Sequence, residues 1–491
     1  MIWSFDKNSF WNAEDGGVAR TFEPPEGTSD ATIIVLEEIS NIARQISRGS
    51  VRLHILPEEF STYWGGVNER TSSSTSKIHF GHYKVAALRK RYAAFFARKL
   101  SFIARSGWAP SRWGNGMNVL LEKIAGIALV NKLRAILLFE ADSNMFNRLL
   151  LSNRPMELAR EHGVIPPEQY AERQSDGQDG AWLKRLFADI SRQMRLAMAI
   201  ISADAETCYD RIAHVFASLV YQAVGVGISA IMVMLMSIQH MKFFLRTGLG
   251  ESVGYMTAVI GSIIQGLCQG NTAAPAGWSL ISAVLLRAYK RCGHGAKFTT
   301  AITRKTHETA GVLFVDDVDL FVMNSALITR ELWEEAARST ECWSELLTIP
   351  GGSGKGEKCF GYLIDYEWDA CGRWHYAPVP EMDLEIVLPD GSREGIALLP
   401  AEAARVTLGI CTSPDGDDSH HLTNGDRCPP GQTYGWTGLR THIYHPSTHG
   451  SLTDFNFGAA LSMALALYRH RSPVWERSRR ILLTELCHFL V

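Results

Sequence analysis

The chain contains the run Gly311-Val-Leu-Phe-Val-Asp-Asp-Val-Asp-Leu-Phe321, which places two adjacent carboxylates between short stretches of apolar, strand-forming residues. β-Branched and aromatic residues on both sides predict a hairpin with Asp316 and Asp317 near its tip. Two like charges side by side repel each other and resist burial unless a cation holds them. A divalent ion such as Mg²⁺, which prefers carboxylate oxygens, is the simplest such cation. Asp-Asp pairs also occur in ordinary surface turns, so a functional interpretation needs partners elsewhere in the chain.

The composition is that of a mostly globular chain. Of its 491 residues, 46% are hydrophobic and 20% are charged. This length is sufficient for two or three domains with their own cores. The formal net charge is −2, so a nucleic-acid partner would have to bind a local basic surface. The nine cysteines form no Cys-x-x-Cys pair and no zinc-knuckle spacing, which fits a reducing compartment. No signal peptide is expected, because no basic flank precedes an apolar core at the N-terminus.

One apolar segment, 216–238, is long enough to be compared with a membrane span. It contains Gln222, Gly225, Gly227 and Ser229, and no other segment of the chain resembles it. We therefore expect a buried pair of helices beneath a sheet, and no membrane partner.

A basic segment runs from Lys84 to Arg112 without any acidic residue. Its apolar residues recur at helical spacing, which predicts a basic amphipathic helix. Such a helix either follows a nucleic-acid backbone or has a solvated face above a packed underside, and both interpretations remain open. The candidate nucleic-acid-binding residues are Arg89, Lys90, Arg91, Arg98 and Lys99.

Apolar periodicity and turn residues predict the remaining elements. They are helices over 31–46, 142–150, 155–161, 182–198, 457–467 and 475–490, strands over 119–123 and 133–138, and a hairpin over 384–399.

Two further segments supply the partners that the acidic pair needs. Asp204 follows the apolar run 200–203, as at the end of a buried strand, and Tyr209 comes five residues later. Between them and the acidic pair lies a glycine-rich loop, Gln265-Gly-Leu-Cys-Gln-Gly-Asn-Thr-Ala-Ala-Pro-Ala-Gly277, which leads into an apolar helix. Glycine lets the backbone approach a ligand closely, and Pro275 is suited to opening a helix.

This order of a lone acid, a Gln-Gly loop with its helix, and aromatic-x-Asp-Asp resembles motifs A, B and C of reverse transcriptases. The closest resemblance is to the reverse-transcriptase domains of non-LTR (LINE-like) retroelements, and it covers roughly residues 70–415. Flanking segments are similar to other parts of that family. They are 119–126 with 132–138 (the fingers hairpin), 165–170 (the segment after it), 351–359 (motif D) and 406–410 (the strand after motif D).

The resemblance implies an α+β fold of the right-hand polymerase type. It would have fingers, a palm made of an antiparallel sheet packed on helices, and a short or partial helical thumb. The implied domains are a variable N-terminal leader (1–76), a fingers-like region with the basic helix (77–200), a palm with motifs A–D (201–380), and a connecting β-hairpin with a partial thumb (381–491).

Nucleotidyl transfer needs a nucleophilic primer 3′-hydroxyl and a neutralised pyrophosphate, which two metal ions can provide. The resemblance implies that Asp204 and Asp316 are the bridging metal ligands and that Asp317 is an outer or third acid. Asp210 and Asp319 are interpreted as structural. An all-oxygen ligand set favours two Mg²⁺ ions as cofactors, and Mn²⁺ would also fit.

The same resemblance assigns roles around the substrate. Tyr209 would lie under the incoming sugar and exclude a 2′-hydroxyl, although it could instead be a core aromatic. Gln269 and Gly270 would line the nucleotide pocket. Lys123 and Arg134 are candidates for binding the triphosphate, or else are cations on an exposed hairpin.

A lysine in the glycine-rich segment 351–359 is the candidate general acid for the leaving pyrophosphate. Lys358 is preferred, and Lys355 is a competing choice because the register of the loop is uncertain from sequence.

The leading hypothesis is a retrotransposon reverse transcriptase, an RNA-directed DNA polymerase that adds dNTPs to a DNA primer on an RNA template. Family resemblance would imply a nuclear location. One alternative is an RNA-dependent RNA polymerase, which Tyr209 and the Gln269-Gly270 loop disfavour. The other is a catalytically inactive remnant that only binds RNA. The polar stretch 170–180, and the lack of a recognisable endonuclease, zinc knuckle or RNase H acid set, favour that remnant.

Overall fold

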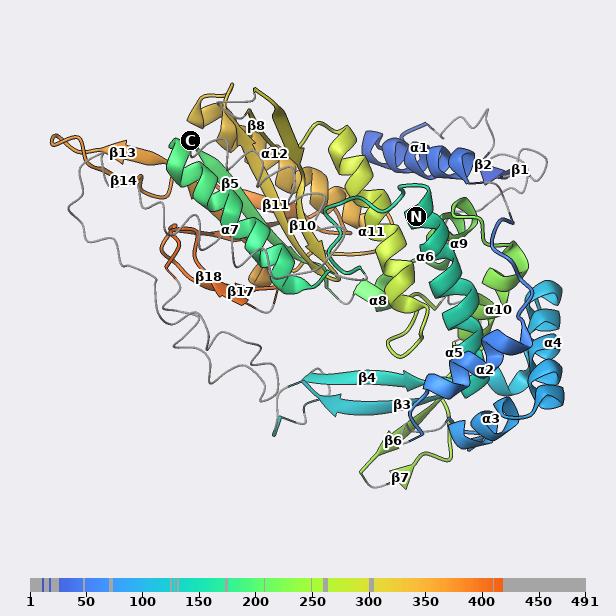
Figure 1. The fold of residues 1–491 in the computed structure, drawn as a ribbon. Helices are drawn as coiled ribbons and strands as arrows, with labels where there is room; N and C mark the ends of the chain where they lie inside the picture. The colour runs from blue at the N-terminus through green and yellow to red at the C-terminus, as the bar shows by residue number, and fades with distance from the viewer. Residues whose placement is uncertain are drawn as a thin grey trace.

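The computed structural model describes residues 26–417 together with 11–12 and 17–18, except for gaps at 47–48, 70–73, 124–125, 128, 130–131, 173–174, 207, 249, 259–263, 300–303 and 409. These residues form an α+β structure, as expected from the sequence, with one large and one smaller sheet (Figure 1). The helices expected over 457–467 and 475–490 lie outside the described residues.

The large sheet has eight strands in the order β15–β16–β12–β5–β11–β8–β9, with β10 paired to β11. Its central strand β5 pairs antiparallel with both β11 and β12. Two parallel pairs, β12 with β16 and β11 with β8, make the sheet mixed, whereas a wholly antiparallel sheet was expected. The strands are β5 (Met198–Asp204), β8 (Ala296–Thr299), β9 (Thr306–Thr309), β10 (Gly311–Phe314), β11 (Asp317–Asn324), β12 (Phe360–Ile364), β15 (Leu384–Val387) and β16 (Arg393–Leu399).

Both faces of the large sheet are covered by helices. Ala199 and Ile201 belong to a core shared with α11 and α12, whereas Met198 and Ile200 belong to a second core shared with α7. A strand that is buried on both faces has no polar alternation, which explains why the run before Asp204 is apolar except for Ser202. The covering helices are α7 (Gly177–Met194), α11 (Ala274–Arg291) and α12 (Thr329–Thr348).

The helix expected over 182–198 begins earlier and ends earlier than predicted. Asp176 caps its N-terminus by accepting hydrogen bonds from the backbone of Gln178 and Asp179. The helix ends at Met194, so Met198 is the first residue of β5 and not the last residue of the helix.

Two N-terminal helices belong to the folded core. Val35, Ile39 and Trp64 are fully buried within the same hydrophobic cluster as the helices beneath the large sheet. These helices lie inside the segment 1–76 that was expected to be a leader, so that part of the segment packs into the core. They are α1 (Asp30–Gln45), which matches the helix expected over 31–46, and α2 (Pro57–Gly66).

The basic segment forms two helices and not one. Arg89 has an extended backbone with φ −114° and ψ 112°, which separates α3 (Phe80–Ala87) from α4 (Lys90–Ser106). The underside of α4, which includes Ala97 and Leu100, is buried, and the helix ends at Gly107 in the left-handed conformation.

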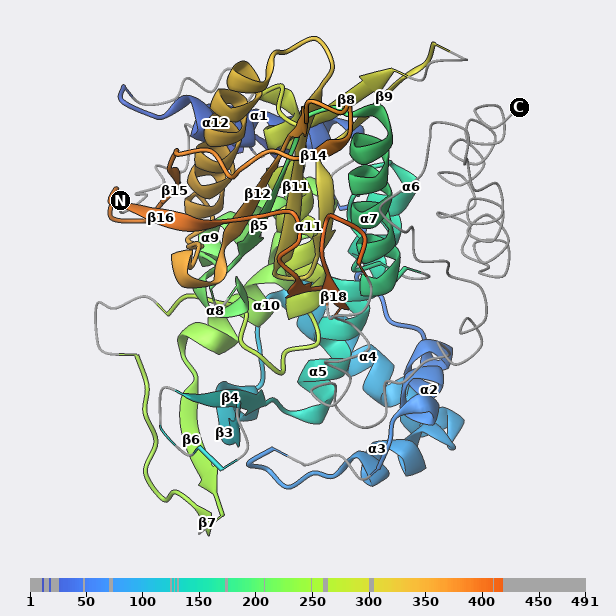
Figure 2. The same cartoon turned by 90° about the vertical axis from the view of Figure 1, so that its left-hand side faces the viewer.

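The smaller sheet lies beyond one end of the large sheet (Figure 2). Its strand order is β4–β3–β6–β7, and β3 and β4 form the antiparallel pair that the sequence predicts. The strands are β3 (Asn115–Glu122), β4 (Leu133–Leu138), β6 (Lys242–Thr247) and β7 (Gly250–Glu251).

The apolar segment 216–238 is the expected pair of buried helices, α9 and α10, joined at a tight turn. Among the described residues, no helix is both long enough and apolar enough to cross a membrane. The segments expected to be helical over 142–150 and 155–161 are joined through a π-helical turn at Arg148–Asn153. The helices are α5 (Ala141–Asn147), α6 (Arg154–Glu161), α8 (Cys208–Arg211), α9 (His214–Ala223) and α10 (Ile228–Gln239).

The remaining elements are short. The hairpin predicted over 384–399 is confirmed by the antiparallel pairing of β15 with β16. The other short strands are β1 (Trp11–Asn12), β2 (Gly17–Val18), β13 (Tyr366–Trp368), β14 (Trp374–Tyr376), β17 (Arg405–Thr407) and β18 (Ile410–Thr412).

A buried ion pair joins α7 to β11. Lys184 Nζ lies 3.0 Å from Asp319 Oδ2, and the two side chains are 6% and 1% exposed. Lys184 also donates a hydrogen bond to Thr407 Oγ1. Neither carboxylate oxygen of Asp319 accepts a hydrogen bond of good geometry. The negative charge of this carboxylate is therefore offset by the nearby ammonium group of Lys184.

Replacing Lys184 with Met should lower the free energy of unfolding by about 3–5 kcal/mol, because it leaves the Asp319 carboxylate buried without a cation. The double variant Lys184→Met/Asp319→Leu should recover most of that loss, since no charge remains buried. Urea unfolding followed by circular dichroism measures both effects. Equal stability of Lys184→Met and the wild type would contradict the buried pair.

Candidate active site

Two strands of the large sheet bring acidic residues together. Asp204 is the last residue of β5 and Asp317 is the first residue of β11, and their Cα atoms are direct partners in the antiparallel ladder. Side chains of directly opposed residues lie on the same face, with Cβ atoms about 5 Å apart. Asp316 is the residue before β11, and its carbonyl oxygen accepts a hydrogen bond from the Ala205 N–H at 3.2 Å. The convergence of acids from separate strands is therefore present in the structure.

The three carboxylates interact unfavourably. Burial, and then repulsion from Asp316 and Asp204, raises the pKa of Asp317 to about 6. Burial also raises the pKa of Asp316, and Asp204 adds to this, whereas the positive charges of Lys358 and Arg134 oppose it. The acids thus form a half-buried site with excess negative charge, which favours the binding of a cation.

Lys358 supplies one positive charge to this site. Its Nζ lies 2.7 Å from Asp204 Oδ2, and this hydrogen bond raises the pKa of the lysine. The competing residue, Lys355, instead lies 3.7 Å from Glu357. The loop before Lys358 is held to the end of β5 by a hydrogen bond from the Glu206 N–H to the Ser353 carbonyl oxygen. The geometry therefore favours Lys358 as the lysine of the acidic site.

The Gln269-Gly270 loop lies between α8 and the smaller sheet. The Leu267 N–H donates to the Tyr209 carbonyl oxygen, and the Leu137 N–H of β4 donates to the Gln269 carbonyl oxygen, both at 2.8 Å. Gly270 has φ +110°, and a Cβ there would collide with the Leu137 carbonyl oxygen. A side chain at this position is excluded by both the backbone conformation and the available space.

Residues of the smaller sheet, and of the turn between β3 and β4, contribute to the same electrostatic environment. The pKa of Asp316 and that of Asp210 are both raised by burial, and the positive charges of Arg134, an exposed residue of β4, and Lys123 counteract part of the respective rises. Burial has the larger effect and raises the pKa of Asp210, and the Gln269 backbone N–H opposes this through a hydrogen bond. Asp210 thus accepts a hydrogen bond from the backbone of the Gln269 loop.

Tyr209 lies half-buried beside the acids. Burial raises the pKa of its hydroxyl, and the negative charge of Asp316 contributes to this shift. It packs at the edge of the main hydrophobic core, so it is close to the acids without being a fully buried core residue.

The candidate nucleic-acid-binding residues are separate from this cluster. Helix α4 lies beside α2, α3 and α10, away from the acidic ends of β5 and β11 (Figure 1). Arg89, Lys90, Arg91 and Arg98 are exposed there. Lys99 lies 3.6 Å from the buried carboxylate of Asp142, so its ammonium group has a structural partner that the sequence did not indicate.

The carboxylates fit a hard divalent cation by their chemistry. Their donor atoms are all oxygens, and their mutual repulsion would be relieved by positive charge. Within the described residues, no group of three or more His, Cys, Asp or Glu side chains is already placed to hold a metal ion. The two-metal site therefore remains a prediction, with Asp204, Asp316 and Asp317 as its candidate ligands.

Two residues near the acids make contacts that the sequence does not indicate. Cys359 Sγ accepts a hydrogen bond from the Asp204 N–H at 3.5 Å. Trp278 of α11 donates its indole N–H to the Val315 carbonyl oxygen, in the turn before Asp316. Both contacts join positions far apart in the chain, so neither is visible in the sequence, although Cys359 is the last residue of the glycine-rich segment 351–359.

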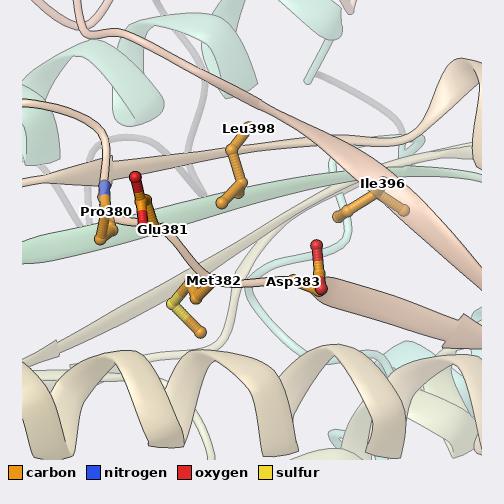
Figure 3. A pocket seen from close by; sticks show the side chains of 6 residues that line it. All are labelled: Pro380, Glu381, Met382, Asp383, Ile396 and Leu398. Atoms are coloured by element: carbon orange, nitrogen blue, oxygen red, sulfur yellow. The ribbon is translucent and has the colours of Figure 1, made fainter.

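A pocket of about 450 Å³ lies elsewhere, beside β16, which is two strands away from β5. Figure 3 shows its lining, with the carboxylates of Glu381 and Asp383 among apolar side chains. It contains none of the candidate site residues.

No model of a known protein family matches this chain, and a search of curated proteins also finds no match.

Asp317→Asn should stabilise the metal-free protein by about 1–2 kcal/mol, after allowance for the partial exposure of the carboxylate. Burial and repulsion raise the pKa of Asp317 from 3.8 to about 6, so the folded wild type is penalised once this group ionises. The advantage of Asp317→Asn should therefore be small at pH 4, grow as the pH rises to about 6, and then stay constant.

Thermal unfolding in EDTA at several pH values measures this difference. Asp383→Asn, which removes an exposed carboxylate, is the matched control and should show no such pH dependence. A constant difference between Asp317→Asn and the wild type from pH 4 to pH 8 would contradict the prediction.

Proposed function

We propose that this chain is a reverse transcriptase that adds deoxynucleotides to a primer 3′-end on an RNA template. The observation that carries the proposal is the direct opposition of Asp204 and Asp317, with Asp316 beside them, where three half-buried carboxylates meet Lys358. Carboxylates from two strands that converge on one point are what two-metal nucleotidyl transfer requires. The large sheet would be the palm of a right-hand polymerase, and the smaller sheet would belong to the fingers.

The chain's own residues suit the steps of this reaction. Asp204 and Asp316 would hold the metal ions, which when bound would supply charge for the nucleophile and the leaving group. Arg134 and Lys123 come from the fingers-like sheet and would bind the triphosphate. Lys358 is 58% exposed, and as an ammonium group it would donate the proton that the leaving pyrophosphate takes up.

The substrate side of the site favours deoxynucleotides over ribonucleotides. Tyr209 lies beside the acids, where a ring would exclude a 2′-hydroxyl. The absence of a Cβ at Gly270 keeps the backbone of the loop close to β4, next to the proposed nucleotide pocket. A polymerase that uses ribonucleotides would instead need a polar group to bind that hydroxyl.

The purified protein should extend a DNA primer on an RNA template with dNTPs and Mg²⁺. The double variant Asp316→Ala/Asp317→Ala should lose at least about 100-fold in rate, because it removes the acids that would hold the metal ions. Primer extension on a sequencing gel measures both rates. Parallel reactions with NTPs test the substrate class.

Asp383→Ala, which removes one exposed carboxylate, is the control and should retain the wild-type rate. Wild-type extension no faster than that of Asp316→Ala/Asp317→Ala would contradict the proposal. Exclusive use of NTPs would replace it with an RNA-dependent RNA polymerase.

The surface of α4 supports a nucleic-acid partner independently of catalysis. Tyr92, Phe95 and Phe102 are each about 60% exposed, and Arg91 and Arg98 lie at neighbouring helical positions. Arginines that bind phosphates, interspersed with aromatic rings that stack on bases, are typical of surfaces for single-stranded nucleic acids. This surface would also serve a remnant that only binds RNA.

The variant Arg89→Glu/Lys90→Glu/Arg91→Glu should bind single-stranded RNA more weakly and with less salt dependence. Each phosphate contact on a single strand contributes about 0.7 to the slope of log affinity against log salt, so losing three contacts should flatten that slope by about 2. Fluorescence anisotropy with a labelled RNA over a range of salt concentrations measures it. Reversal of exposed charges on α12, in Arg330→Glu/Arg338→Glu, is the control, and the same loss in both variants would exclude α4 as the binding surface.

A further inference from the structure

The turn that carries Asp316 has a backbone conformation that its sequence does not favour. Phe314 and Asp317 are paired, so Val315 and Asp316 form the loop of a two-residue hairpin. Val315 has φ +57°, whereas Asp316 does not have a positive φ. A positive φ at only the first loop residue is the pattern of a type II′ turn, where glycine is the usual residue.

A β-branched residue in this region is strained. Such a conformation persists only where the surrounding structure holds it, and strained residues of this kind gather at functional sites. The side chain of Val315 packs against the main hydrophobic core, so it is ordered and not simply a loop tip in water.

Both carbonyl groups of the turn are held by residues outside the hairpin. Trp278 Nε1 donates to the Val315 carbonyl oxygen at 2.5 Å, and the indole belongs to a nearly fully buried side chain of α11. The Asp316 carbonyl oxygen accepts from the Ala205 N–H, which directly follows Asp204. The turn is thus fixed between the helix beneath the sheet and the end of β5.

We propose that Trp278 is a positioning residue for Asp316. Its indole N–H holds the Val315 carbonyl oxygen, maintains the strained turn, and so keeps the Asp316 carboxylate directed at the site that it shares with Asp204. Trp278 is 3% exposed and acts through the turn without touching substrate. The role of Asp316 in this statement rests on the proposed function, whereas the effect of Trp278 on the turn does not.

The competing interpretation is that Trp278 is only a large core side chain. The two interpretations differ in how they depend on Val315. If the hydrogen bond maintains a strained turn, relief of that strain by Val315→Gly makes the bond unnecessary. If Trp278 contributes only packing volume, its replacement has the same effect whichever residue occupies position 315.

The test is a double-mutant cycle of Trp278→Phe and Val315→Gly. Trp278→Phe keeps an aromatic ring and removes the N–H donor. The first measurement is hydrogen–deuterium exchange of the peptide that contains residues 314–318. Trp278→Phe should speed exchange there by about tenfold or more when Val315 is present, and by less than about threefold in the Val315→Gly background.

The second measurement is the kinetics of primer extension. Trp278→Phe should lower kcat by about 10- to 100-fold with little change in KM for the nucleotide, because a small displacement of a reacting group has an effect of that size. In the Val315→Gly background the same substitution should change kcat by less than about threefold. Trp343→Phe, which alters another buried indole on α12, should leave both measurements near their wild-type values.

Equal effects of Trp278→Phe in the two backgrounds would overturn the proposal and leave Trp278 as a packing residue. Unchanged exchange and kcat in Trp278→Phe alone would also overturn it. The exchange measurement needs no activity, so it decides the role of Trp278 even if the wild type does not extend a primer. Circular dichroism of all four proteins identifies any variant that has failed to fold.

Discussion

The antiparallel pairing of β5 with β11 is the constraint on which the rest of the site depends. It sets Asp204 directly against Asp317, and the apolar residues before and after these acids fix the register by their burial on both faces of the sheet. A slip of one residue would move every side chain of a strand to the opposite face, so the acids could not meet. The helices α7, α11 and α12 therefore matter to the candidate site chiefly because they make that register unique.

Several unfavourable features are concentrated within the few residues around this pairing. Asp317 is held next to two other acids, and Val315 has a strained backbone. Asp319, two residues after Asp317, has a buried carboxylate. Each feature has a compensating neighbour: Lys358 for the acids, Trp278 for the turn and Lys184 for Asp319. Local departures from good folding rules are expected where a sequence is constrained by function as well as by stability.

The sequence predicts those features that depend on local pattern. The run before Asp204 and the hairpin around Asp316 follow from apolar, strand-forming residues, and the helix pair over 216–238 and the hairpin over 384–399 follow from apolar periodicity and turn residues. It does not predict features that depend on contacts between distant segments. Trp278 meets Val315 across 37 residues, and Cys359 meets Asp204 across 155, so no local pattern contains either contact. The sequence does not predict the break between α3 and α4, because apolar periodicity continues through Arg89. It does not predict the ion pair of Lys99 either, because the partner carboxylate, that of Asp142, is distant in the chain.

Helix α1 has a consequence for how such a protein can change over time. Its carboxylates pair with α11, Glu38 with Arg287 and Glu37 with Arg291, while its apolar face closes the core beneath the large sheet. The recognisable motifs begin well downstream, yet the shared core extends back to about residue 30. A recombination event that replaced everything before the motifs would remove one wall of the core beneath the large sheet. The smallest segment that can be inherited with this core intact is therefore longer than the segment that the motifs define.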